Sequence, residues 1–213
     1  MENTNNPSRP EDELQYIRSI IADSRASFVE DGKPYVLWGL IVAVGMGITY
    51  ISVLTQRDLY IGFVWMVLVL IGWGSSIYYL IQQRKQTQRA PSFLDRIQRS
   101  IWTACGSALG LSIVLILVFR HSNPAEPSIH PFYVTFVTSL ILGIAYYLSG
   151  IAHDIKWLRN IGFAWWGGAI VMYLWPSVHV IGINAAMLIL FQVVPGIVLM
   201  RRYKRITSQS AEA

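Results

Sequence analysis

The four histidines of this 213-residue chain are the side chains best suited to bind a metal ion or to move protons. Three of them, His121, His130 and His179, match no spacing typical of a zinc site, even when Glu126 is added as a ligand. The fourth, His153, precedes an aspartate and is typical of a solvated helix end. No two histidines are placed to hold a haem between helices. The sequence therefore predicts neither a metal site nor a cofactor.

A serine nucleophile beside a histidine base would indicate an enzyme, and Ser149 followed by His153 is such a neighbourhood. A serine at a helix end near a histidine is common, however, and no glycine-rich phosphate loop follows a strand. The single cysteine, Cys105, excludes an intramolecular disulfide and a multi-cysteine metal site. We therefore expect no catalytic residue and no enzymatic activity.

The elements that position these residues are predicted from the composition. Apolar residues make up 54% of the chain and charged residues 14%, with a mean hydropathy of +0.43, which favours a bilayer environment. A helix needs about 20 apolar residues to cross the hydrocarbon layer. Six runs without Lys, Arg, Asp or Glu meet this need: Pro34–Leu54, Tyr60–Ile81, Ile101–Phe119, Phe132–Ala152, Ile161–Val178 and Gly182–Met200. The predicted fold is an all-α polytopic membrane protein whose six transmembrane helices form three helical hairpins.

Lysine and arginine are concentrated in alternate connections between these runs. The first, third and fifth connections hold only Arg57 and Arg120 of the 17 basic residues. Because positively charged loops stay in the cytoplasm, both termini are predicted to be cytoplasmic, and no signal peptide is evident. We expect a cytoplasmic segment (1–33), a transmembrane domain (34–200) and a basic tail (201–213). Attraction to anionic lipid explains the net charge of +5, so no nucleic acid partner is expected.

An amphipathic helix is predicted before the first run, because apolar residues recur there at helical spacing. Its apolar face holds Leu14, Ile17, Ile21 and Phe28. Three alternatives stay open for this face: the bilayer surface, the protein's own loops, or a cytoplasmic protein partner. In the second connection, Arg84 and Lys85 are candidates for contact with lipid headgroups or a partner.

The predicted bundle interior lacks the acidic and basic side chains that ion or proton transport usually requires. Gln192, near Pro195, can bridge helices or bind carbonyl groups freed by the proline. Abundant aromatic residues indicate an alternative, a site for a neutral or apolar ligand, although membrane-belt and packing roles explain such rings too. The candidate ligand contacts are Trp65, Trp73, Tyr146, Trp165 and Gln192.

A repeat is indicated by three tryptophans, Trp38, Trp102 and Trp166, which are separated by 64 residues each. Gly72 and Gly143 each precede a lysine by 13 residues. These patterns favour three related hairpins, but a membrane belt of tryptophans would give the same spacing.

Small residues also recur every four positions in several runs, which allows helices to pack closely. The third run has a doubled pattern that includes Gly106 and Gly110, and it is a candidate surface for a homo-oligomer.

Two segments resemble a known group of proteins. They are Leu148–Gly168, LSGIAHDIKWLRNIGFAWWGG, and the entry Ile20–Gly39 with SFVEDGKPYVLWG. Both are similar to small six-span bacterial membrane proteins, of uncharacterised function, found in Bacteroidetes. The hairpin plan also resembles the acid-resistance membrane protein family HdeD, whose repeated glycine pattern is not clear in every hairpin here. The resemblances imply a bacterial inner-membrane location and a stress-linked or unknown role, and they supply no site residue.

Taken together, these patterns predict a non-enzymatic inner-membrane protein that acts through a protein partner or lipid. The alternative is a small transporter, channel or carrier of a neutral or apolar ligand.

Overall fold

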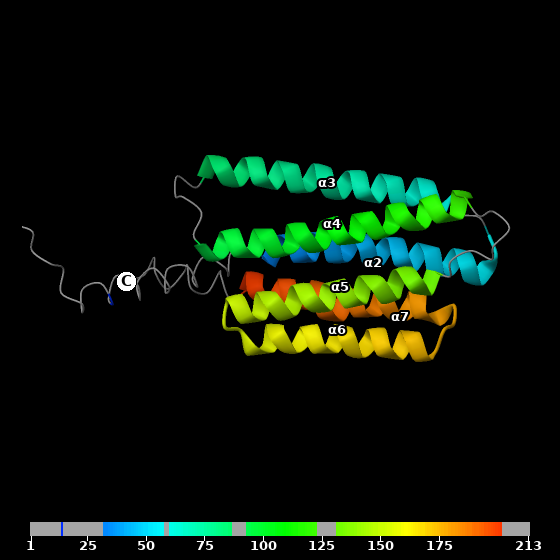
Figure 1. Cartoon of the computed structure of the whole chain (residues 1–213). Helices are drawn as coiled ribbons and strands as arrows, with labels where there is room; N and C mark the ends of the chain where they lie inside the picture. Colours follow the sequence, from blue (N-terminus) through cyan, green and yellow to red (C-terminus); the bar gives the residue numbers. More distant parts are fainter. Residues whose placement is uncertain (1–13, 15–31, 58–59, 87–92, 123–130, 202–213) are drawn as a thin grey trace, which may run out of the picture.

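The computed structural model describes residues 14, 32–57, 60–86, 93–122 and 131–201, and the regular secondary structure in these ranges is helical. The helices lie side by side with nearly parallel axes in one elongated bundle (Figure 1). Four helices are long and apolar enough to cross a membrane. They are α2 (Gly32–Thr55), α3 (Ile61–Gln86), α5 (Pro131–Ala152) and the helix His179–Arg201, which begins with α7 (His179–Leu188). An all-helical chain with several membrane-length helices is therefore confirmed.

The other two predicted spans are also helical and run alongside the first four (Figure 1). They are α4 (Phe93–Ser122) and α6 (Lys156–Leu174). Lys156 and Arg159 occupy the start of α6 and shorten its apolar part. Six spans therefore stay a prediction, and four helices of the described chain meet the criterion of length and apolarity.

Successive helices alternate in direction (Figure 1). We call the end where α2, α4 and α6 begin the His153 end, and the opposite end the His179 end. His153 lies in the short turn from α5 to α6, where Asp154 has a φ of 54°. An aspartate tolerates this left-handed conformation better than most residues do.

The helices α5 and α6 form the most extensive contact in the described chain. Glycines allow it, because a Cβ on Gly162 would lie 2.8 Å from the carbonyl oxygen of Gly143. These two helices belong to different predicted hairpins. The closest helix pair therefore does not follow the hairpin division that the sequence predicts.

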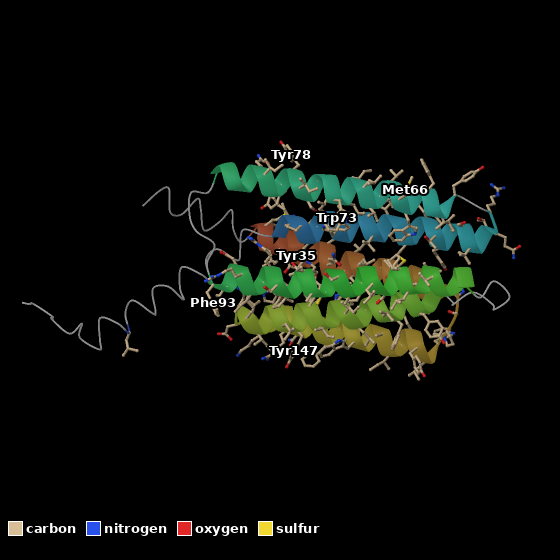
Figure 2. All side chains as sticks on the ribbon, turned by 45° about the horizontal axis from the view of Figure 1, so that its top comes forward. Tyr35, Met66, Trp73, Tyr78, Phe93 and Tyr147 are labelled. Atoms are coloured by element: carbon tan, nitrogen blue, oxygen red, sulfur yellow. The ribbon has the colours of Figure 1, made fainter. Side chains whose placement is uncertain are left out.

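The helix α3 packs mainly against α2, at the edge of the bundle. The indole of Trp38 on α2 lies against Gly72, and its Nε1 donates to the Ser76 Oγ at 3.0 Å. Farther along α3, Tyr78 points away from the bundle and is 69% exposed (Figure 2). Only one side of α3 is thus covered by protein.

Trp166 on α6 has a similar position against Gly143 of α5, and its Nε1 donates to the Leu140 carbonyl oxygen at 3.2 Å. The two glycines that the sequence pattern matches, Gly72 and Gly143, therefore each face a tryptophan of an antiparallel helix. A duplicated hairpin stays a prediction.

The last two helices differ from the predicted boundaries. α6 ends at Leu174 and α7 begins at His179, whereas the prediction was Val178 and Gly182. The turn at Pro176 explains the earlier end, since proline interrupts helical hydrogen bonding. A π-helical segment, η2 (Ile189–Val193), then precedes Pro195. Such a wide turn accommodates a proline, which has no N–H to donate and whose ring would clash with the carbonyl group one turn earlier.

Candidate functional site

One face of α5 carries polar side chains into the bundle along nearly the whole helix. Its buried positions alternate between spacings of four and three residues, the period of one helix face. The positions are Thr135, Ser139, Leu142, Tyr146, Ser149 and His153, each at most 4% exposed. We call these residues, without Leu142, the α5 polar face. The opposite side exposes apolar residues such as Leu140, Ile144 and Leu148, which suits contact with lipid.

The helices α2 and α4 add further polar side chains at the His153 end. The Tyr35 hydroxyl of α2 accepts hydrogen bonds from the Gln98 Nε2 at 2.7 Å and from the Trp102 Nε1 at 3.0 Å. The ring of Tyr146 lies 5.7 Å, between centroids, from the rings of both Tyr35 and Trp102. Ser149 lies about one turn beyond Tyr146 on the same face. We call Tyr35, Gln98, Trp102, Tyr146 and Ser149 the Tyr35 cluster.

Three buried polar atoms of this cluster have no hydrogen-bond partner in the described part of the chain. They are the Gln98 Oε1, the Tyr146 hydroxyl and the Ser149 Oγ. An unsatisfied buried polar atom costs about 1–3 kcal/mol, and hydrocarbon offers no replacement for the missing partner. The Ser149 Oγ is also not bonded to His153.

His153 lies just beyond the end of α5 and is 4% exposed, so the predicted solvated helix end is corrected to a buried one. Burial lowers the pKa of His153 from 6.5 to about 4, while the nearby Asp95 carboxylate acts in the opposite direction. The imidazole is therefore neutral at pH 7. Among the described residues, no Lys, Arg, Asp or Glu is buried. The interior beside the α5 polar face thus carries no formal charge.

Toward the His179 end, Asn184 of α7 continues the polar interior. Its Nδ2 donates to the Ser139 Oγ at 3.1 Å, and its side chain is fully buried. The Asn184 Oδ1 and the Gln192 Oε1 are buried without a hydrogen-bond partner in the described chain. Gln192 lies in η2 and packs against Gly39, where a Cβ would be 3.1 Å from the Gln192 Cγ. Polar atoms without partners therefore occur in both halves of the bundle.

Of the predicted ligand contacts, Tyr146 and Trp165 belong to one buried cluster against which Trp65 packs, whereas Trp73 is exposed. Tyr146, Trp165 and Gln192 are buried, as expected for interior contacts. Trp65 is half-buried between α2 and α3, where its Nε1 donates a hydrogen bond to the Thr49 Oγ1. Trp73 is 60% exposed, because α3 packs on one side only. The prediction that Trp73 lies in the bundle interior is therefore wrong.

Most of the predicted partner and lipid contacts lie outside the described part of the chain. Ile17, Ile21 and Phe28 lie outside the described residues, whereas Leu14 has a helical backbone and is 55% exposed. Arg84 and Lys85 lie at the end of α3, and their side chains are outside the described part of the chain.

Sequence reasoning missed the polar face as a unit. The sequence patterns single out Trp102 only as part of a repeat, do not single out Tyr35, and place Gln98 in a connection between spans. The signal that could have found the face is the alternating spacing of Thr135, Ser139 and their successors in an otherwise apolar span.

In the described residues, no group of three or more His, Cys, Asp or Glu side chains is arranged to hold a metal ion. No protein-family model, curated protein or solved structure matches the chain. The candidate function therefore depends on the α5 polar face and the side chains around it.

Proposed function

We propose that this membrane protein is a non-enzymatic carrier or channel for a small uncharged molecule that passes along the α5 polar face. The observation that carries the proposal is the set of buried polar atoms that lack a partner in the described chain, at Gln98, Tyr146, Ser149, Trp165, Asn184 and Gln192. In a bilayer these atoms have no access to bulk water, so a guest molecule that forms hydrogen bonds would stabilise them.

The guest is polar and uncharged rather than apolar. An apolar ligand would leave every one of these polar atoms unsatisfied. A charged ligand would need a counter-charge, and no buried Lys, Arg, Asp or Glu is present in the described chain. Both considerations favour a neutral molecule with hydrogen-bonding groups.

The proposal includes six spans and two cytoplasmic termini in a bacterial inner membrane. The distribution of basic residues supports this orientation, because 15 of the 17 lie in the segments assigned to the cytoplasm. In this topology the His153 end is the cytoplasmic end, and the α5 polar face leads from it toward the outer surface.

Solute entry into proteoliposomes tests the proposed function. We expect stopped-flow light scattering to show faster entry of acetamide or glycerol into vesicles with the protein than into empty vesicles. A Ser112→Ala variant is expected to give the same entry rate as the unmodified protein, because the Ser112 hydroxyl donates to the Ala108 carbonyl oxygen of its own helix. Equal entry rates for all small neutral solutes in both kinds of vesicle would refute the carrier proposal.

A second candidate function is interaction with a protein partner or with lipid through the amino-terminal segment. It is favoured by the exposed apolar side chain of Leu14. Deletion of the residues before Gly32 is expected to leave membrane insertion intact and to abolish capture of a crosslinked partner. Unchanged capture would count against this function.

Homo-oligomer formation would use α4. A Cβ at Gly106 or Gly110 would meet no atom within 4 Å, so this small-residue surface is open in the single chain. Crosslinking of the purified protein in bilayers would test whether a second copy covers it.

A further inference from the structure

The Tyr35 cluster combines hydrogen-bonding groups in a way that restricts the guest. Three of its side chains are at least nine-tenths buried and have a polar atom with no partner in the described chain. Gln98 is 9% exposed, and Tyr146 and Ser149 are both at 0%. The three come from two facing helices, α4 and α5, with Tyr35 of α2 beside them.

The Tyr35 hydroxyl fixes the orientation of the Gln98 amide. Gln98 donates through Nε2 to this hydroxyl at 2.7 Å, which leaves Oε1 as the group without a partner. Trp102 donates to the same hydroxyl at 3.0 Å. An amide oxygen only accepts hydrogen bonds, so a guest at Gln98 must offer a donor.

On the α5 side of the cluster, the guest must offer a hydrogen-bond acceptor. The hydroxyl groups of Tyr146 and Ser149 can both donate, so a guest that offers a carbonyl oxygen would satisfy either of them. A donor and an acceptor held close together in one neutral molecule are the features of a carboxamide or a urea.

We propose that the Tyr35 cluster is a binding site for a small neutral amide, whose N–H groups donate to Gln98 and whose carbonyl oxygen accepts from Tyr146 or Ser149. This inference rests on the proposed function and names the substrate class. The rings of Tyr35, Trp102 and Tyr146 supply the apolar wall against which a methyl group of the amide would pack.

Three molecules of nearly equal shape test the chemistry of the site. Acetamide has the donor and the acceptor, acetone lacks the N–H donor, and acetate is charged. We expect saturation-transfer NMR on the full chain in lipid nanodiscs to detect acetamide binding, weaker binding of acetone and none of acetate. Failure of acetamide to bind, which would leave water as the partner of these atoms, overturns the proposal. Equal binding of acetone overturns it too.

Variants of the cluster test the location. Tyr146→Phe and Ser149→Ala remove only atoms that bond to no other residue, so the fold should tolerate both. At least one of the two is expected to weaken acetamide binding about tenfold, the effect of one hydrogen bond. The matched controls, Tyr147→Phe and Ser112→Ala, are expected to bind acetamide like the unmodified protein. Unchanged binding in both cluster variants would overturn the proposed site.

Acetamide entry into proteoliposomes, measured on the same preparations, separates the site from the proposed function. Binding that depends on the cluster without faster entry would refute the carrier and leave the site standing. Faster entry that neither cluster variant slows would refute the site and leave the carrier standing.

Discussion

Trp102 on α4 donates its indole N–H to the phenolic oxygen of Tyr35 on α2 over 3.0 Å. Gln98, one helical turn earlier, donates to the same oxygen. A single hydroxyl thus accepts from a buried and a half-buried donor and connects the start of α2 to α4. On the α5 side, by contrast, the Tyr146 hydroxyl has no such partner in the described chain. This difference between two neighbouring tyrosines leads to opposite predictions for the same substitution.

Tyr35→Phe is expected to destabilise the protein by about 2 kcal/mol or more, because the Gln98 amide and the Trp102 indole both lose their acceptor. The free energy of unfolding in mixed detergent and SDS micelles measures the effect. The control is Tyr173→Phe, since Tyr173 is exposed. If both variants unfolded like the unmodified protein, the two hydrogen bonds to Tyr35 would have no energetic role.

Tyr146→Phe is expected to raise the free energy of unfolding by about 1–3 kcal/mol when no solute is added, because it removes a buried hydroxyl that lacks a partner. The neighbouring Tyr147→Phe should change stability by less than about 0.5 kcal/mol, because the ring contacts of Tyr147 with Phe163 and Trp166 are kept. A clear loss of stability in Tyr146→Phe would mean that its hydroxyl is satisfied within the protein.

Stability is expected to fall as the pH decreases from about 6.5 toward 4, because burial lowers the pKa of His153 to about 4 in the folded state. The unfolded state, with a histidine pKa of 6.5, binds the proton first in this range, so protonation favours unfolding. Unfolding titrations at several pH values measure the slope. His153→Gln should flatten it. Equal slopes in the variant and the unmodified protein would contradict the neutral, buried His153.

Gly162→Ala is expected to cost about 1–3 kcal/mol, because the new methyl group would press on the backbone of α5, 2.8 Å from the Gly143 carbonyl oxygen. Gly167→Ala on the same helix is the matched control, since a Cβ there meets no atom within 4 Å. Thermal unfolding of both variants in detergent compares them. Equal midpoints would show that α5 and α6 are not in close backbone contact.

The helices could be predicted from the sequence because membrane length and the absence of charge are strong signals. The same signals do not locate the helix ends. The predicted third span began at Ile101, whereas α4 begins at Phe93, because Asp95, Arg96 and Arg99 continue the helix beyond the apolar part. Charge marks where a span leaves the hydrocarbon layer and not where a helix ends.

The inward faces could not be predicted in the same way. In an all-apolar span both the lipid and the protein core accept the same side chains, so Trp73 and Trp165 look alike in sequence, yet one is exposed and the other buried. The polar face of α5 has a readable period, but Thr138 interrupts the pattern with a polar side chain that is only half-buried. The partners Tyr35 and Gln98 come from helix ends, and only the packing of the helices brings them to α5.

The most direct test of a solute path along α5 is the accessibility of substituted cysteines in membrane vesicles. In a Cys105→Ala background, Ser139→Cys and Ser149→Cys lie on the α5 polar face, while Leu140→Cys and Leu148→Cys lie on its exposed apolar side. We expect a small water-soluble thiol reagent to modify the two serine positions, more slowly when acetamide is present, and to leave the two leucine positions unmodified. Unreactive cysteines at positions 139 and 149, or equal reaction at all four positions, would contradict the account.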